Sequence, residues 1–150
     1  MPQSLANNTI HLVFSTNERK RLLNDELRPE LHGYLATVFK NEKCPAIVIN
    51  SMEDHIHILF VLHRTVALSK IVEEVKKSSS KWVKTKSPLL KTFSWQAGYG
   101  AFSVSQSNIS AVKQYILNQE EHHRTMSFQD ELRKFLTKHG MGYDERYLWD

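Results

Sequence analysis

The chain has 150 residues, of which 41% are hydrophobic and 24% are charged, the usual composition of a soluble globular protein with one hydrophobic core. No apolar run approaches the ~18 residues that span a bilayer, and the N-terminal stretch lacks the basic segment and apolar core of an export signal. We therefore expect a single cytoplasmic domain over residues 1–150, and we exclude membrane proteins and disordered proteins.

The cysteine count and the net charge limit what the domain can bind. With Cys44 as its single cysteine, the chain can form neither an internal disulfide nor a zinc site of several cysteines. Any metal must then be held by histidine, carboxylate or amide ligands. The net charge of +4 and the isoelectric point near 9.2 permit a polyanionic partner without requiring one.

The first half of the chain predicts three strands and one helix. Residues 9–16 ("TIHLVFST") form an apolar, β-branched run typical of a strand, and the basic turn "NERKR" follows it. Residues 24–40 carry apolar side chains at the spacing of an amphipathic helix. Residues 45–50 ("PAIVIN") and 55–62 ("HIHILFVL") are strand-like runs so close together that we expect an antiparallel hairpin.

The second half predicts helices and one more strand. Residues 67–86 return to helical spacing with a basic outer side, residues 99–105 alternate like a strand, and helices are expected over 108–122 and 128–138. The order β-α-β-β-α-β with additional C-terminal helices predicts an α+β, ferredoxin-like (RRM-like) fold, an antiparallel sheet with two helices on one face. The other face stays available for a ligand or another helix.

Two histidines interrupt the strand at residues 55–62. Side chains alternate along a strand, so His55 and His57 share one face while Ile56, Ile58 and Phe60 share the other. If helices cover the apolar side, both imidazoles point to the second face. By itself, such a pair is more often a solvent-facing polar stripe than a metal site.

The helix expected over residues 108–122 adds a second group of polar side chains. Tyr115 and Gln119 lie one helical turn apart, and His122 continues the same stripe. Two imidazoles and an amide oxygen leave coordination positions open on a divalent cation, and a tyrosine one turn away can attack a phosphate polarised by that cation. The alternative is a packing tyrosine beside a solvated glutamine.

Both motifs occur together in a known family. "DHIHILF" resembles the His-hydrophobic-His motif of the HUH endonucleases, and "YILNQEEHH" resembles the tyrosine helix of the single-tyrosine transposases of the insertion-sequence 200/605 family. "HLVFSTNERKRLL", "SSSKWVK" and "FSWQAGYGAFSVSQS" occur in the family's order. The resemblance implies that His55, His57 and Gln119 bind the metal, typically Mg²⁺ or Mn²⁺, and that Tyr115 is the nucleophile.

The resemblance also implies a biological reaction and a partner. Family members cleave and rejoin single-stranded DNA at the ends of their element through a 5′-phosphotyrosine intermediate, recognise hairpins near those ends, and work as homodimers whose active sites are often shared between chains. For this chain we therefore expect a mobile-element transposase that binds such DNA as a homodimer.

Basic residues on two segments are candidates for phosphate contacts. They are Arg19, Lys20 and Arg21 after the first strand, and Lys76, Lys77, Lys81 and Lys84 on the helix over residues 67–86. His63, His122 and His123 are candidates for further ligands or phosphate contacts. Each of the lysines could equally belong to a solvated helix face, and the three histidines are more often ordinary surface or packing residues.

Two other functions remain compatible with the sequence. A sheet of this strand order also builds RNA-recognition domains, so the chain could be a nucleic-acid-binding module without catalysis. Those domains bind through aromatic side chains on the sheet surface, where this chain has His55 and His57. A domesticated transposase or a replication-initiator-like HUH nickase would share the chemistry and differ in its DNA target.

Overall fold

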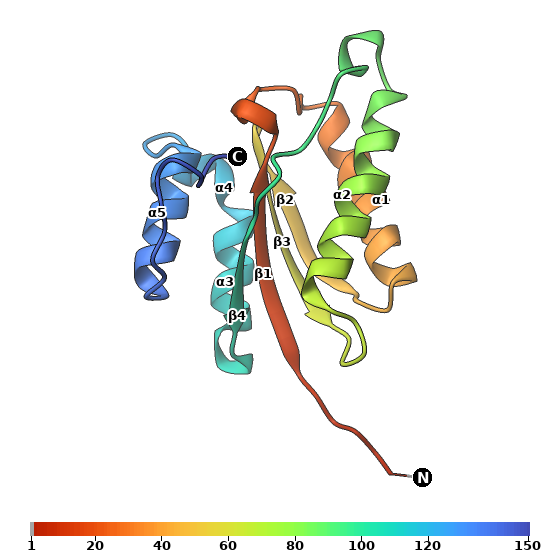
Figure 1. The fold of residues 1–150 in the computed structure, drawn as a ribbon, viewed down its shortest axis with the longest axis vertical. Helices are drawn as coiled ribbons and strands as arrows, with labels where there is room; N and C mark the ends of the chain where they lie inside the picture. The colour runs from red at the N-terminus through yellow and green to blue at the C-terminus, as the bar shows by residue number, and fades with distance from the viewer. Residues whose placement is uncertain (1) are drawn as a thin grey trace.

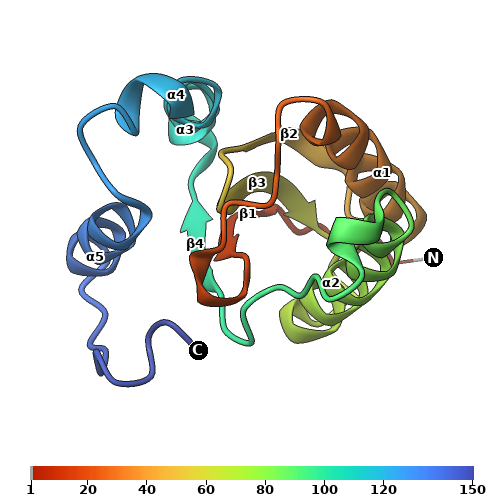
Figure 2. The same ribbon diagram turned by 90° about the horizontal axis from the view of Figure 1, so that it is seen from above.

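The computed structural model describes residues 2–150. An antiparallel sheet lies at its centre, with helices on both sides (Figures 1 and 2). The elements in chain order are β1 (Asn8–Ser15), η1 (Asn17–Arg19), α1 (Leu27–Asn41), β2 (Ala46–Ser51), β3 (His55–Leu62), α2 (Leu68–Lys84), η2 (Pro88–Leu90), β4 (Gly100–Val104), η3 (Gln106–Asn108), α3 (Ile109–Leu117), α4 (Gln119–His122) and α5 (Phe128–Lys138).

The strand order of the sheet is β2-β3-β1-β4, and every neighbouring pair is antiparallel. β1 therefore lies between β3 and β4, with Val13 opposite His57 and Ser15 opposite His55. This order and the element sequence β-α-β-β-α-β confirm the ferredoxin-like fold predicted from the sequence. The short connection between β2 and β3 forms the expected hairpin.

The larger core lies between the sheet and the helices α1 and α2. Ile56, Ile58 and Phe60 of β3 point into it, as the alternation along this strand predicts. The buried stripes of the two helices complete it, and Trp95 closes one end, where its Nε1 donates a hydrogen bond to Ser79 Oγ at 2.9 Å. Trp95 is therefore a core residue.

The second face of the sheet is not open, because α3, α4 and α5 of the same chain lie over it (Figure 2). A smaller cluster of buried apolar residues joins this layer to the sheet: Val13, Phe102, Phe128, Leu132 and Leu136. β1 and β4 place apolar side chains on both faces, so the second face also needs cover. The histidines of β3 are consequently inside the protein and not on its surface.

The helix expected over residues 108–122 is divided in two. α3 ends at Leu117 and α4 begins at Gln119, with Asn118 between them at φ −95° and ψ 25°, outside the helical region. The expected helix over residues 24–40 begins later than predicted, although the Asn24 side chain does accept a hydrogen bond from Leu27 N at 2.9 Å. Among residues 2–150, none of the helices has the length and apolar character needed to cross a bilayer.

Candidate metal and tyrosine centre

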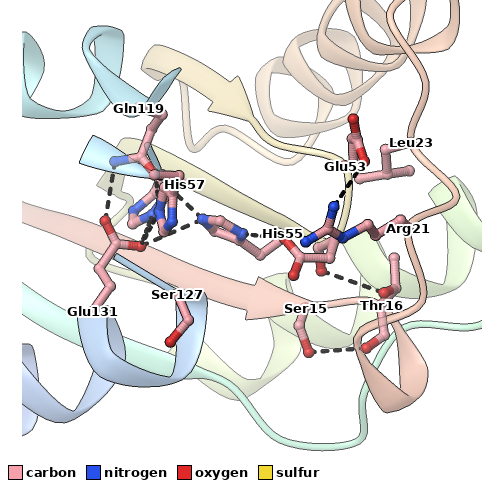
Figure 3. A network of polar contacts seen from close by, with 12 residues as sticks. Ser15, Thr16, Arg21, Leu23, Glu53, His55, His57, Gln119, Ser127 and Glu131 are labelled. Carbon is pink, nitrogen blue, oxygen red and sulfur yellow. Dashed lines mark hydrogen bonds and ion pairs between the residues drawn. The ribbon is translucent and has the colours of Figure 1, made fainter. Parts of the chain in front are cut away.

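The two histidines of β3 occupy the middle of the second face and are fully buried. Their rings lie side by side, with centroids 5.3 Å apart. Each ring directs Nε2 toward the C-terminal layer, where His55 Nε2 lies 3.2 Å from Gln119 Oε1 and His57 Nε2 lies 2.9 Å from Glu131 Oε1 (Figure 3). The structure thus brings His55, His57 and Gln119 together, as the sequence predicts.

Tyr115 reaches the same centre from α3. Its hydroxyl donates a hydrogen bond to Glu131 Oε2, and its ring lies 6.0 Å from the ring of His57. The ring of His122 stacks on the ring of Tyr115, with centroids 4.3 Å apart. The predicted stripe of Tyr115, Gln119 and His122 therefore holds despite the break at Asn118.

Two further residues belong to this centre. Glu131 of α5 is buried, and its Oε1 lies 3.1 Å from Nε2 of His123 and 3.4 Å from Nε2 of His55. His123, which follows α4, also places Nε2 3.1 Å from Gln119 Oε1. Of the three spare histidines named from the sequence, His123 enters the centre, whereas His63 pairs with Thr65 elsewhere.

The ring orientations are fixed by partners on the opposite nitrogen. His55 Nδ1 lies 2.7 Å from Asp54 Oδ1, and His57 Nδ1 lies 2.8 Å from Nε2 of the buried His11. His123 Nδ1 donates to the backbone oxygen of Met126 at 2.6 Å. All three rings are therefore held with Nε2 directed at one point, the arrangement seen in protein metal sites.

The charges of the centre are coupled. Burial by itself would raise the pKa of Glu131, but attraction to His57 and hydrogen bonds with His123 and His55 hold that pKa well below its ordinary value. Burial lowers the pKa of His57, whereas for His55 the hydrogen bonds with Asp54 and Glu131 overcome burial and raise the pKa to about 9. The two neighbouring histidines therefore differ, with the pKa raised for His55 and lowered for His57.

The environment of Tyr115 keeps its phenol protonated. Burial raises the pKa of this hydroxyl, and the negative charge of Glu131 raises it further. A nucleophilic tyrosine in this position therefore needs a nearby positive charge or a proton acceptor at the moment of attack. The Glu131 carboxylate is already in hydrogen-bond contact with the hydroxyl.

The donor set fits a divalent cation. His55, His57, His123 and Glu131 each offer one ligand atom, and these four atoms all lie within 4.8 Å of one another. Imidazole nitrogens and carboxylate oxygens bind divalent metals in proteins. The amide oxygen of Gln119 faces the same space and adds one more possible donor.

Comparison of the sequence with models of known families identifies the family of the chain. The model of the family described as "Transposase IS200 like" matches residues 4–119, which is most of the chain. The chain belongs to the IS200-like transposase family. None of the curated proteins matches its sequence.

Two solved structures share the fold of this transposase. One is a candidate transposase from Deinococcus radiodurans R1, with 22% identity and a TM-score of 0.62 over 79% of this chain and 98% of that chain. The other is a REP-associated tyrosine transposase bound to a REP hairpin, with 17% identity and a TM-score of 0.60 over 82% of this chain and 72% of that chain.

Two cavities open onto the centre of the transposase. The first, of about 660 Å³, is bordered by Asp54 and His123 and by the arginines 19, 21 and 124. The second, of about 490 Å³, is bordered by Tyr115 and Glu131 and has Lys134 and Lys138 in its wall. Both sides of the centre are therefore reachable from solvent past positively charged side chains.

The predicted DNA-contacting residues fall into two groups. Arg19 borders the first cavity, and Lys20 is exposed beside it, 3.7 Å from Glu18. Lys77, Lys81 and Lys84 are exposed on α2, which covers the opposite face of the sheet. Their distance from the centre makes them candidates for binding DNA outside the cleavage site.

Lys76 differs from its neighbours on α2 and has an internal role. Its Nζ donates to the backbone oxygens of Gln96 at 2.8 Å and Gly98 at 2.7 Å and lies 5.1 Å from the centre of the Phe14 ring. Burial lowers its pKa to about 8. These hydrogen bonds use the donors of Lys76 within the protein, and its expected contact with phosphate stays a prediction.

Sequence reasoning missed Glu131, His11 and Asp54. Glu131 lies on the stripe of α5 that also carries Phe128 and Leu132, so a charged residue on an apolar helix face was the available signal. His11 similarly interrupts the apolar run of β1. His11 opens the segment "HLVFSTNERKRLL" and Asp54 opens "DHIHILF", whereas Glu131 lies outside the quoted motifs, and only the fold brings the three residues to one centre.

Proposed function

We propose that this transposase cleaves and rejoins single-stranded DNA at the ends of its insertion sequence through a 5′-phosphotyrosine intermediate on Tyr115. The observation that carries the proposal is the position of the Tyr115 hydroxyl. It contacts one oxygen of the Glu131 carboxylate, whose other oxygen faces the Nε2 atoms of His55 and His57. A nucleophile and a set of metal-binding nitrogens therefore meet at one carboxylate.

The chemical step needs one bond exchange at phosphorus. Tyr115 Oη attacks the scissile phosphate, the Oη–P bond forms, and the bond from phosphorus to the 3′ oxygen breaks. The phenol proton passes to Glu131, which already accepts its hydrogen bond, and the departing 3′ oxygen takes up a proton to become a free hydroxyl. Attack of another 3′ hydroxyl on the phosphotyrosine reverses the exchange and rejoins the strands.

His55, His57 and Gln119 would hold a divalent cation, Mg²⁺ or Mn²⁺, which would supply Lewis-acid polarisation of the phosphate and stabilisation of charge on the displaced oxygen. The residues of the chain provide the rest of the site. Glu131 positions the Tyr115 hydroxyl, and Arg19 and Arg21 in the wall of the adjoining cavity can contact the phosphates of the strand.

Hairpins near the element ends are the proposed recognition element. A structural neighbour was solved with a REP hairpin, and the exposed Lys77, Lys81 and Lys84 offer this chain a basic surface away from the cleavage site. A non-catalytic module of the RNA-recognition type is disfavoured, because α3–α5 cover the sheet face that such modules use. A domesticated nickase would use the same centre on a different DNA target.

The test is covalent capture. Single-stranded oligonucleotides from the genomic DNA flanking the gene, labelled at the 3′ end, should give a labelled protein band that survives denaturation, because the phosphotyrosine holds the fragment on the 3′ side of the cut. We expect Tyr115→Phe to abolish the band, EDTA to prevent it, and Mg²⁺ or Mn²⁺ to restore it. Replacing His55, His57 or Gln119 should impair it.

The exposed Tyr147 provides the matched control, since Tyr147→Phe removes the same hydroxyl from a side chain on the surface. For the histidines, asparagine is preferable to alanine, because both rings are fully buried and alanine would leave a cavity. A band that persists in Tyr115→Phe, or cleavage that EDTA leaves unchanged, would refute the proposed mechanism.

A further inference from the structure

We propose that His123 and Glu131 are ligands of the same ion as His55 and His57, and that the completed centre selects a transition metal such as Mn²⁺, Co²⁺ or Zn²⁺ over Mg²⁺. The inference deepens the proposed function, on which it rests for the existence of the metal. It concerns residues beyond Gln119, where the family match ends. Metal binding is measured without DNA, so it can succeed or fail independently of strand cleavage.

The first support is convergence on one atom. Glu131 Oε1 lies 2.9, 3.1 and 3.4 Å from the Nε2 atoms of His57, His123 and His55, respectively. Donor atoms that surround one ion at about 2.1 Å lie roughly 3 to 3.5 Å from one another. The three distances from Glu131 Oε1 therefore already match those within a coordination sphere, and all four donor atoms lie within 4.8 Å of one another.

The second support is the orientation of His123. Its Nδ1 donates to the Met126 backbone oxygen, which can only accept, and this hydrogen bond directs Nε2 toward the centre. The Asp54 carboxylate holds His55 in the same way. Metal-binding histidines typically donate their second nitrogen to a carboxylate or a backbone carbonyl. His123 is therefore oriented for metal binding in the same way as the predicted ligand His55.

The third support is that the two oxygens of the Glu131 carboxylate have different partners. Oε1 faces the imidazoles, whereas Oε2 accepts the Tyr115 hydroxyl and the Gln119 amide, the latter at 3.2 Å. A carboxylate that binds the ion through one oxygen and the tyrosine through the other fixes the position of the nucleophile relative to the ion. Glu131 thus acts as a ligand and as a positioning residue for Tyr115.

Ligand chemistry then determines the metal. Mg²⁺ requires near-ideal octahedral geometry, favours oxygen donors and usually keeps several waters. Three imidazole nitrogens with one carboxylate oxygen, and the Gln119 amide nearby, leave room for few waters and suit first-row transition metals. A site made of His55, His57 and Gln119 alone would offer two nitrogens and one oxygen. Such an open site would leave room for the waters that Mg²⁺ keeps, so Mg²⁺ could compete there with transition metals.

The first experiment uses the unchanged protein. After removal of metals with EDTA and dialysis, calorimetric titration with Co²⁺, Mn²⁺ and Mg²⁺ should show one transition-metal ion per chain, bound about tenfold or more tightly than Mg²⁺. In the Co²⁺ form, each coordinated imidazole with a protonated Nδ1 gives one strongly shifted, solvent-exchangeable proton signal in the NMR spectrum. Three such signals are expected; two would remove His123 from the ligand set.

Variants then test the two added ligands separately. Glu131→Gln and His123→Asn should each weaken Co²⁺ binding by at least the roughly 10- to 100-fold that loss of an outer-shell partner causes, and each should change the visible spectrum of bound Co²⁺. The matched controls are Glu120→Gln, on the exposed side of α4, and His63→Asn, outside the centre. Tyr115→Phe should keep Co²⁺ affinity within about threefold, because tyrosine contacts the carboxylate and not the ion.

Circular dichroism of each variant without metal establishes that it is folded, and the NMR signal count on the unchanged protein does not depend on any variant. The proposal is overturned if Mg²⁺ binds as tightly as Co²⁺. It is also overturned if folded Glu131→Gln and His123→Asn bind Co²⁺ with unchanged affinity and spectrum. Tight Co²⁺ binding without any DNA adduct would instead contradict the proposed transposition chemistry and leave the metal centre intact.

Discussion

Both ring nitrogens of His57 have a partner. One partner is His11, which orients the His57 ring although it is not itself a candidate metal ligand. His11 is buried on β1, and its Nε2 lies 2.8 Å from His57 Nδ1. Burial and the neighbouring His57 hold the pKa of His11 well below its ordinary value, so it stays neutral and can accept the His57 ring proton. That hydrogen bond leaves His57 Nε2 directed at Glu131.

We therefore predict that His11→Phe weakens transition-metal binding by roughly tenfold or more, since it removes the acceptor while keeping an aromatic ring in the same space. His11→Gln should recover part of the affinity, because its amide oxygen can again reach His57 Nδ1. Calorimetric titration with Co²⁺ measures both variants. Equal Co²⁺ affinity in His11→Phe and the unchanged protein would show that the ring orientation is fixed by other contacts.

The predictability of the centre depends on how far apart in sequence its residues lie. His55 and His57, and Tyr115 and Gln119, are two short motifs whose spacing places each pair on one face of a strand or along one helix stripe. Glu131 has no such partner in sequence and reaches the centre only because α5 folds over the sheet. The sequence therefore predicts the pairs, and the fold adds the residue that joins them.

Among the elements, α3 and α4 show where periodicity fails to detect a break. Apolar and polar stripes continue from Tyr115 through Gln119 to His122, so the pattern predicts one helix. Asn118 leaves the helical region between them, and its side chain makes no capping hydrogen bond. The strands were predicted within a few residues because side-chain alternation and the short connection between β2 and β3 are local signals.

His32 connects two elements and makes their contact sensitive to acid. Its Nε2 on α1 lies 2.7 Å from Ser51 Oγ at the end of β2. Burial, with a contribution from Arg28, lowers the pKa of His32 from 6.5 to about 4. Between these two values the unfolded chain binds a proton that the folded chain does not, so the free energy of unfolding falls as the pH drops from about 6.5 toward 4.

We predict that His32→Gln, which keeps a polar contact with Ser51 but cannot titrate, loses less stability over this pH range. Thermal unfolding in EDTA at several pH values between 7.5 and 4.5 measures the difference. Other buried histidines titrate in both proteins, so the informative quantity is the difference in melting temperature between the unchanged protein and the variant at each pH. This difference should shrink, or change sign in favour of the variant, as the pH falls. A difference that stays constant with pH would contradict the role given to His32.

At the scale of the whole molecule, the two faces of the sheet are covered by layers of different kinds. The layer of α1 and α2 buries a large apolar core, whereas the layer of α3–α5 rests on a small apolar cluster and on the polar centre. α3 also contacts β2 directly, where Asn50 Nδ2 donates to the backbone oxygen of Ile116 at 2.8 Å. In the single chain, Tyr115 therefore lies beside the histidines of its own sheet.

The homodimer expected from the family resemblance remains a proposal, in which the tyrosine helices of two chains exchange places. An exchanged α3 would make the same contacts with the partner's sheet, and the segment from Ser105 to Asn108 is the connection that would have to cross. We predict that mixing a His57→Asn chain with a Tyr115→Phe chain, each inactive alone, partly restores adduct formation. In a mixed dimer with shared sites, one site carries both defects and the other carries none.

Subunit exchange must be shown independently, for example with two differently tagged chains purified in sequence. A tagged pair of His57→Asn chains serves as the control, because exchange between them cannot rebuild a complete site. If exchange is proven and activity does not return, each site is formed within one chain, as the contacts of Asn50 with Ile116 in the single chain allow.

The ligand positions give a bound ion a mechanical role as well. His55 and His57 belong to the central sheet, while His123 and Glu131 belong to the outer layer, so one ion would cross-link two layers that otherwise share little apolar contact. An ion that binds only when the outer layer is packed on the sheet stabilises this packed arrangement by its free energy of binding. The cation that activates the phosphate would then also hold the outer layer on the sheet. Without the cation, the helix that carries Tyr115 would be less stably packed against the sheet.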